Sequence, residues 1–248
     1  MKRTIVKVLP WMMAVFPLSA CAAAPPGQLL DLSSWKLTLP VDVAKPLGSP
    51  DEIKSPELKN FAHLRYFFVE NGAVIFRAPC GGATTKNSKY PRCELREMSA
   101  DGTSRAAWDT RASLVRSMTL QASITKTPKV KRHVVCAQIH DADDDLMMVR
   151  LEGDKLFIER NKIGDVLLQD GYRLGDSFSV KIEAGKGRVK VWYNGELKMD
   201  WEVAKRGCYF KAGCYTQSNP EKGDRADDYG EVIISKLKLE TQKNHPNE

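Results

Sequence analysis

The sequence predicts an all-β protein, folded as a single-domain antiparallel β-sandwich of the jelly-roll type. Two hairpin signals, a series of further strand-like segments and the absence of alternating strand and helix patterns lead to this prediction. Asn71-Gly72 and Asn194-Gly195 each separate two β-prone runs, and Asn-Gly favours a hairpin because both turn positions adopt positive φ. The strands expected from these hairpins are 65–70, 73–78, 189–193 and 196–201.

Further segments combine β-prone residues with flanking turn residues. They are 92–99, 112–124, 133–140, 146–151, 155–160, 178–184, 208–217 and 230–239. Only residues 51–64 suggest a helix. Because the strands are short and no internal repeat divides them, we expect one domain over residues 31–240 rather than two.

The composition is that of a folded protein with a mildly basic surface. The chain has 248 residues, of which 42% are hydrophobic and 28% charged, so it can bury a substantial core. Its 38 basic and 31 acidic side chains give a net charge of +7. No basic stripe or nucleic-acid-binding motif is present, so we expect no nucleic acid partner. A surface of this kind suits an extended polyanion such as an acidic polysaccharide.

Residues 1–20 have the pattern of an export signal. Lys2, Arg3 and Lys7 precede a short apolar run over 8–18, which is too short to span a bilayer. No apolar stretch long enough to span a membrane follows residue 20. We therefore expect an exported protein, located at the outer membrane, in the periplasm or outside the cell.

The end of this leader resembles a bacterial lipoprotein box. Leu18-Ser19-Ala20-Cys21 would place a lipid on Cys21, which would be the only contact with the membrane. The alternative is ordinary cleavage after Ala22-Ala23-Ala24. In either case Cys21 is lost to the fold. We assign residues 21–30 to a linker before the domain and residues 241–248 to a tail after it.

Five cysteines remain after Cys21, in what we expect to be an oxidising compartment. The expected disulfides are Cys208–Cys214 and Cys80–Cys93, whose members lie close in sequence, with Cys136 free. An unbroken strand would hold two residues six positions apart at roughly 20 Å, beyond disulfide reach. The first bridge therefore requires a bend before Lys211.

Three of the expected strands carry chemically active side chains on one face. Residues two apart on a strand share a face. The sets that share a face are Arg92, Glu94 and Arg96; Gln138 and His140; and Tyr209, Lys211, Tyr215 and Gln217. For one strand alone, a solvated sheet face is the simpler interpretation. Three strands rich in His, Gln, Tyr and paired Arg favour a site that binds carboxylates and moves protons.

These strands also carry a family resemblance. Residues 92–97 (Arg-Cys-Glu-Leu-Arg-Glu), 138–140 (Gln-Ile-His) and 209–217 (Tyr-Phe-Lys-Ala-Gly-Cys-Tyr-Thr-Gln) resemble the signature strands of the alginate lyases of polysaccharide lyase family seven. Segments 35–40, 84–88 and 228–232 are similar to other parts of that family. Cys93 departs from the pattern, in which Ser or Thr is more common, but it faces the core. The resemblance implies a concanavalin-like jelly roll that needs no cofactor or metal, and we expect a monomer.

The resemblance also implies the reaction. Family members cleave 1,4-linked polyuronates such as alginate by β-elimination: the C5 proton of a uronate is removed and the C4–O bond breaks, leaving a 4,5-unsaturated sugar. By motif position, Arg92 and Gln138 neutralise the carboxylate, while His140 and Tyr215 handle the protons. Ile139 weakly favours guluronate-containing substrate.

The remaining motif residues are expected to line the cleft. They are Glu94, Arg96, Lys211 and Gln217. We expect Glu94 to organise Arg92 and Arg96 as an ion-pair network rather than to take part directly in the reaction. Cationic neighbours such as Lys211 or Arg92 are expected to lower the pKa of Tyr215.

Other interpretations of the sequence are weaker. Asp141, Asp143, Asp145 and Glu152 match positions of a calcium loop, but the position that needs Gly is Leu146. A non-catalytic carbohydrate-binding module is the main alternative, although such a module does not need both a His and a Tyr in the motif. A glycoside hydrolase would need two facing carboxylates, and the motif faces contain only Glu94.

Overall fold

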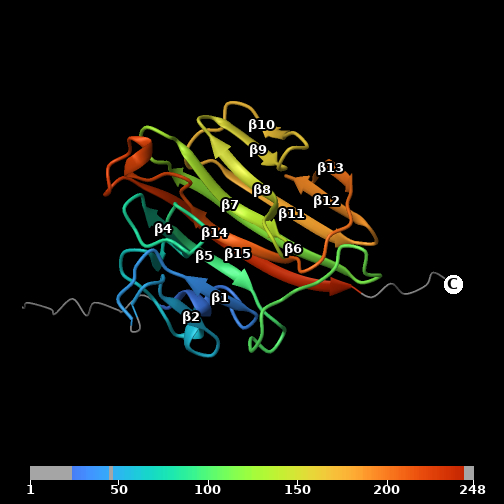
Figure 1. Cartoon of the computed structure of the whole chain (residues 1–248), viewed down its shortest axis with the longest axis horizontal. Coiled ribbons are helices and arrows are strands. Elements are labelled where there is room, and N and C mark those ends of the chain that lie inside the picture. The colour runs from blue at the N-terminus through green and yellow to red at the C-terminus, as the bar shows by residue number, and fades with distance from the viewer. Residues whose placement is uncertain (1–23, 45–46, 243–248) are drawn as a thin grey trace, which may run out of the picture.

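A computed structural model describes residues 24–44 and 47–242, which form two packed antiparallel β-sheets (Figure 1). This arrangement confirms the predicted sandwich. The leader, Cys21 and residues 243–248 of the tail lie outside the described residues. Within the described ranges, no helix is long and apolar enough to cross a membrane.

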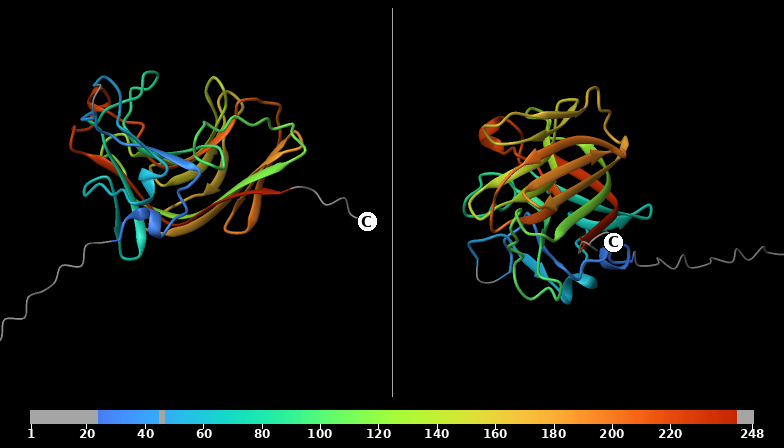
Figure 2. Two further views of the ribbon diagram at one scale, coloured as in Figure 1. Left: turned by 90° about the horizontal axis from the view of Figure 1, so that it is seen from below. Right: turned by 90° about the vertical axis from the view of Figure 1, so that its right-hand side faces the viewer.

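Sheet A has eight strands in the order β10-β9-β8-β7-β14-β5-β1-β2. Its strands are β1 (Trp35–Thr38), β2 (Glu52–Lys54), β5 (Arg92–Glu97), β7 (His133–His140), β8 (Asp145–Glu152), β9 (Lys155–Glu159), β10 (Val166–Gln169) and β14 (Tyr209–Tyr215). Figure 2 shows that the sheets are strongly bent, with loops extending beyond the strands on both sides.

Sheet B has seven strands in the order β13-β12-β11-β6-β15-β4-β3. Its strands are β3 (Phe67–Glu70), β4 (Ala73–Pro79), β6 (Val115–Lys126), β11 (Ser177–Gly185), β12 (Arg188–Tyr193), β13 (Glu196–Glu202) and β15 (Tyr229–Gln242). Three short 3₁₀ turns complete the described elements: η1 (Pro26–Gln28), η2 (Glu57–Lys59) and η3 (Pro220–Lys222).

Both predicted hairpins are confirmed. Asn71 and Gly72 connect β3 to β4 with φ of 50° and 75°, and Asn194 and Gly195 connect β12 to β13 with φ of 49° and 86°. Positive φ at both central positions gives the turn a twist that matches the flanking strands.

The helix predicted over 51–64 is wrong. Its first part is the edge strand β2, which pairs with β1 through Ile53 and Leu37, and only η2 is helical. Pro56 stands between them and cannot continue a helix that begins before it. Leu58 is fully buried and anchors the short turn to the core. Tertiary pairing therefore overrides a weak local preference.

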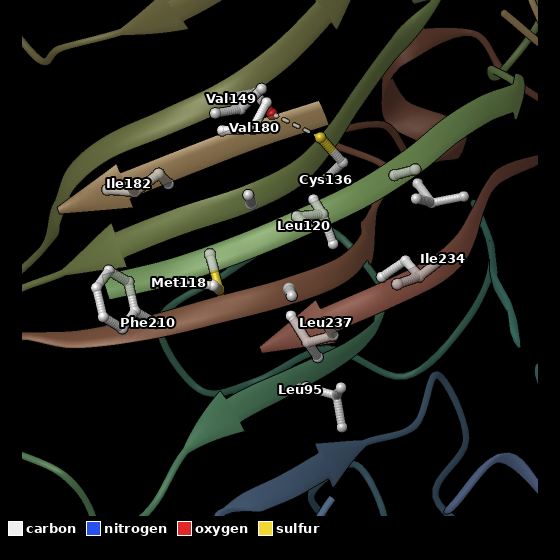
Figure 3. Close-up of a cluster of buried hydrophobic side chains, with 14 of the residues drawn as sticks. Leu95, Met118, Leu120, Cys136, Val149, Val180, Ile182, Phe210, Ile234 and Leu237 are labelled. Carbon is white, nitrogen blue, oxygen red and sulfur yellow. Dashed lines mark hydrogen bonds between the residues drawn. The ribbon is translucent and has the colours of Figure 1, made fainter. Parts of the chain in front are cut away.

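The hydrophobic core lies between the two sheets. Figure 3 shows Leu95 and Phe210 of sheet A near Met118, Leu120 and Leu237 of sheet B. Because strand side chains alternate, filling the core with one set of residues turns the other set of β5, β7 and β14 to the outer face of sheet A. That outer face carries the candidate site.

The predicted disulfides are not formed: all five described cysteines are free and buried. Cys214 lies in β14 and Cys208 immediately precedes the same extended strand, so no bend brings them together. Cys80 follows β4 of sheet B, whereas Cys93 lies within β5 of sheet A. Closeness in sequence therefore did not predict which cysteines lie near one another, because a strand holds its residues extended rather than folding them back.

Candidate active site

Three neighbouring strands bring the predicted site residues together on the outer face of sheet A. The sheet runs β7-β14-β5 at its centre, so the three motif strands lie side by side. Lys211 of β14 pairs in register with Arg96 of β5 and with Gln138 of β7. Tyr215 pairs with Arg92. Alternation thus gathers polar side chains that are distant in sequence.

Gly213 allows β14 to approach β5 closely between Lys211 and Tyr215. Its φ is 139°, and a Cβ at this position would lie 2.6 Å from the Cys93 carbonyl oxygen and 2.9 Å from Glu94 Cα. Any larger residue would push the strands apart or distort the backbone. The glycine therefore holds Lys211 and Tyr215 on either side of Glu94.

Glu94 is the centre of a buried ion cluster. It is only 1% exposed, and its carboxylate accepts hydrogen bonds from Lys211 Nζ at 2.5 Å, Arg92 Nη1 at 3.1 Å and Gln138 Nε2. Burial alone would raise the pKa of Glu94, but the Lys211 and Arg92 charges hold it below its ordinary value. Glu94 organises ion pairs as expected, although its partner is Lys211 rather than Arg96.

The same burial acts on Lys211 in the opposite sense. Desolvation and the nearby Arg92 charge lower the pKa of Lys211 to about 8, against the stabilising charge of Glu94. The ammonium group is therefore charged at neutral pH and loses its charge in mildly alkaline solution.

Tyr215 lies between a cation and a hydroxyl group. The Arg92 guanidinium carbon is 4.0 Å from the centre of the Tyr215 ring, and the phenolic oxygen is 3.2 Å from Ser88 Oγ. Burial raises the pKa of Tyr215, and this outweighs the lowering effect of Arg92 and Ser88. The expected lowered pKa is therefore wrong in sign. Tyr215 is protonated at neutral pH, which is the form of an acid.

His140 presents a neutral imidazole. Its ring stacks on Tyr209 with centroids 5.2 Å apart, and burial lowers the pKa of His140. Nδ1 lies 3.0 Å from the carbonyl oxygen of Asp141, which can only accept a hydrogen bond. Nδ1 therefore carries the ring proton, and the lone pair of Nε2 is free to accept a proton, so that His140 can act as a base.

A cleft of about 780 Å³ covers this part of sheet A. It is lined by four of the predicted residues, Arg92, Arg96, His140 and Lys211, and by Lys36, Thr38, Arg105, Tyr209 and parts of the loops 49–52, 85–88 and 143–144. Sequence patterns did not identify Lys36, Arg105 or Ser88 as site residues. Lys36 stands on a strand that was not predicted, and the other two reach the cleft from loops, which carry no periodic signal.

The cleft has cations without a carboxylate partner. The Arg96 guanidinium carbon lies 3.6 Å from the centre of the Tyr209 ring, and Arg96 Nε is buried without a hydrogen-bond partner. Among the described residues, neither Arg96 nor the exposed Arg105 forms a salt bridge. Such guanidinium groups are suited to carboxylates of a bound chain.

Two further residues considered in the sequence are Gln217, expected to line the cleft, and Asp141, which begins the acidic segment that resembles a calcium loop. Gln217 follows β14, where its Nε2 is 3.6 Å from Met148 Sδ and its Oε1 is buried without a partner. The Asp141 carboxylate caps its own turn, accepting the backbone N–H groups of Asp143 and Asp144 at 2.8 Å. No group of His, Cys, Asp and Glu within the described part of the chain is arranged to hold a metal ion.

Comparison with known proteins places the chain in a family. Residues 30–241 match the alginate lyase family. An alginate lyase of Klebsiella pneumoniae is 27% identical over 294 aligned positions, which cover 91% of this chain and 94% of that protein.

Solved structures agree with this assignment. The alginate lyase AlgAT5 from polysaccharide lyase family 7 is 48% identical, with a TM-score of 0.84 over 89% of this chain and 100% of that chain. The alginate lyase from Corynebacterium sp. is 39% identical, with a TM-score of 0.83 over 89% of this chain and 99% of that chain. The chain therefore belongs to the alginate lyases of polysaccharide lyase family 7.

Proposed function

We propose that this alginate lyase cleaves its substrate by β-elimination, releases 4,5-unsaturated oligosaccharides and prefers blocks that contain guluronate. The observation that carries the proposal is that a neutral imidazole, His140, and a protonated phenol, Tyr215, share the face that also holds Arg92 and Gln138. Elimination needs a base, an acid and donors for a carboxylate, and these four residues supply all of them.

Arg92 and Gln138 act on the carboxylate of the uronate that loses its proton. The C5 proton is a poor acid while that carboxylate is fully charged, so donors must stabilise the enolate as it forms. Arg92 uses Nη1 for Glu94 and its Nε is buried, whereas Nη2 has no partner among the described residues and is available to a sugar carboxylate. Glu94 fixes Arg92 and Gln138 in place, because it accepts a hydrogen bond from each.

His140 removes the C5 proton of guluronate through Nε2, and Tyr215 donates a proton to the departing O4. In mannuronate the C5 proton lies on the opposite side relative to the leaving oxygen, so Tyr215 serves in both roles there: it passes its own proton to O4 as it takes the C5 proton. A related family 7 alginate lyase was crystallised with a substrate written GGMG after one histidine and one tyrosine had been replaced. That pair of residue types supports the roles given to His140 and Tyr215.

The remaining cations of the cleft hold the flanking sugars. Arg96, Arg105 and Lys211 line the cleft and each offer a positive charge to the carboxylates of a polyuronate, although Lys211 shares its charge with Glu94. Gln217, next to Met148, would add an amide. Ile139, between Gln138 and His140, favours guluronate-containing blocks.

Three substrates test this proposal: polyguluronate, polymannuronate and mixed blocks. The expected products absorb in the ultraviolet because they carry the 4,5-double bond, and they form fastest from guluronate-containing chains. New reducing ends without that absorbance would show hydrolysis, and binding without any product would show a carbohydrate-binding module. Equal or faster cleavage of polymannuronate would overturn the preference for guluronate but not the elimination.

The leader supports a further proposal about location. Lys2, Arg3 and the apolar run 8–18 favour export, and Leu18-Ser19-Ala20-Cys21 favours lipid attachment at Cys21. The enzyme would then act at the outer membrane, on alginate that is outside the cytoplasm.

A further inference from the structure

Ser88 Oγ contacts three polar groups of the loop between β4 and β5 and of strand β14. It is 3.2 Å from Tyr215 Oη, 3.2 Å from the Tyr90 carbonyl oxygen and 3.1 Å from the Tyr90 backbone nitrogen. A serine hydroxyl has one proton to donate and two lone pairs that accept. The Tyr90 N–H can only donate and the Tyr90 carbonyl can only accept, whereas the Tyr215 hydroxyl can do either.

These contacts define two hydrogen-bonding arrangements. When Tyr215 is neutral, its hydroxyl donates to Ser88 Oγ, which also accepts from the Tyr90 N–H and donates its own proton to the Tyr90 carbonyl. When Tyr215 has lost its proton, it can no longer donate. Rotation of the Ser88 hydroxyl by its single torsion then directs the same proton to the phenolate oxygen. The Tyr90 carbonyl gives up this bond, and no proton leaves Ser88.

We propose that Ser88 is a positioning residue for Tyr215, whose hydroxyl rotates between the Tyr90 carbonyl and the Tyr215 oxygen as the tyrosine gives up and regains its proton. This inference rests on the role given to Tyr215 under Proposed function. In each cycle on guluronate Tyr215 passes its proton to O4 of the leaving sugar. His140 then releases the C5 proton to water and Tyr215 takes a proton from water, while the Ser88 O–H bond stays intact.

The phenolate needs such a partner because Tyr215 is half-buried, and this burial raises the pKa of its hydroxyl group. Arg92 stabilises the negative charge through the ring face, 4.0 Å from the ring centre, and not through a hydrogen bond to the oxygen. Ser88 Oγ is the hydrogen-bond partner of Tyr215 Oη within the described residues. A buried oxyanion without a hydrogen bond is costly, so a donor at this position favours loss of the proton.

The loop that carries Ser88 is tied to the end of β14. Asn219 Nδ2 donates to the Lys89 carbonyl at 3.1 Å, and Thr216 Oγ1 donates to the Pro91 carbonyl at 3.1 Å. Thr216 is fully buried and directly follows Tyr215 in the chain. The distance between Ser88 and Tyr215 is therefore set by the folded protein before substrate arrives, and only the hydroxyl torsion has to change.

Two substitutions separate the hydroxyl from the rest of the side chain. Ser88→Ala removes the donor, and Ser88→Thr keeps it. A hydrogen bond to a charged group is worth about 10- to 100-fold in an equilibrium or rate, so Ser88→Ala is expected to lower kcat on polyguluronate by roughly that factor. Its KM should stay within about twofold of the wild type, and the alkaline limb of its kcat profile should move to higher pH because Tyr215 becomes a weaker acid. Ser88→Thr should restore most of kcat.

A double substitution tests whether Ser88 acts through Tyr215. In a Tyr215→Phe enzyme, adding Ser88→Ala should not lower the residual rate further. Any of three results would overturn the proposal: a wild-type kcat in Ser88→Ala, a Ser88→Thr enzyme as slow as Ser88→Ala, or a change in Ser88→Ala that is confined to KM. If Tyr215→Phe itself retains wild-type activity, the role of Tyr215 fails first. If Tyr215→Phe is slow and Ser88→Ala is normal, only the Ser88 proposal fails.

Discussion

Glu94→Gln removes the negative charge of the buried ion cluster while keeping the shape of the side chain. Its partners Arg92 and Lys211 are only 9% and 7% exposed, so they cannot turn to water without moving the strands. The substitution therefore leaves two buried cations facing a neutral amide. The free energy of unfolding should fall, because a buried charge without its partner is strongly unfavourable.

The size of this loss follows from the burial of all three groups. Removing one partner of a buried ion pair typically costs about 3–5 kcal/mol. For a domain of this size, each kcal/mol lowers Tm by about 2–4 °C, so the expected fall is roughly 6–20 °C. Lys211 already has its pKa lowered to about 8, and without Glu94 it can shed its proton more easily. The loss should therefore be largest near pH 6, where Lys211 stays charged, and smaller as the pH rises toward about 8.

Thermal unfolding followed by circular dichroism near pH 6 measures this effect. Glu240→Gln is the matched control, because Glu240 pairs with Lys238 on the surface at 2.7 Å, with both side chains more than a third exposed. Such a pair contributes less than about 1 kcal/mol. A Glu94→Gln protein that unfolds at the same temperature as Glu240→Gln would refute the buried ion cluster.

Three further predictions concern charge, thiols and anchoring. As pH rises through about 8, Lys211 loses its charge, so KM for a polyuronate should rise in the wild type. Lys211→Arg stays charged and should remove this rise, and a KM that rises with pH as in the wild type would exclude Lys211 as the cause. In a chain that begins after Cys21, no cysteine should react with an alkylating reagent in the native state, and all five should react after denaturation without reductant. Three or fewer reactive cysteines after denaturation would indicate a disulfide. The full-length protein made in a Gram-negative host should partition into detergent, and Cys21→Ser should abolish this; a mature N-terminus at Pro25 would show ordinary secretion instead.

Strand periodicity was the most informative signal in the sequence. Alternation along three segments placed Arg92, Gln138, His140 and Lys211 on one face, and the structure brings them together because the strands are neighbours. Strand β1 escaped prediction because it has only four residues, too few to show an alternation.

Sequence patterns could not predict the contacts that loop residues make. Nothing in the spacing of Ser88 or Arg105 shows that they reach the cleft, since the loop paths depend on tertiary packing. The direction of the Tyr215 pKa shift was also mispredicted. The sign of the shift depends on whether burial raises the pKa more than the Arg92 charge lowers it. This comparison depends on how deeply the Tyr215 side chain is buried, which only the structure shows.

The kcat of Tyr215→Phe on polyguluronate and polymannuronate tests the central claim most directly. The substitution removes only a hydroxyl group, and the neighbouring core residues Phe210 and Cys214 face the other side of β14, so folding should be nearly unchanged. Losing the transferred proton should lower kcat by at least about 10²–10⁴-fold on both substrates, with a much smaller change in KM. An acid–base group is expected to contribute at least about 10²-fold to kcat. If Tyr215→Phe keeps more than about a tenth of the wild-type kcat on both substrates, Tyr215 does not take part in the mechanism.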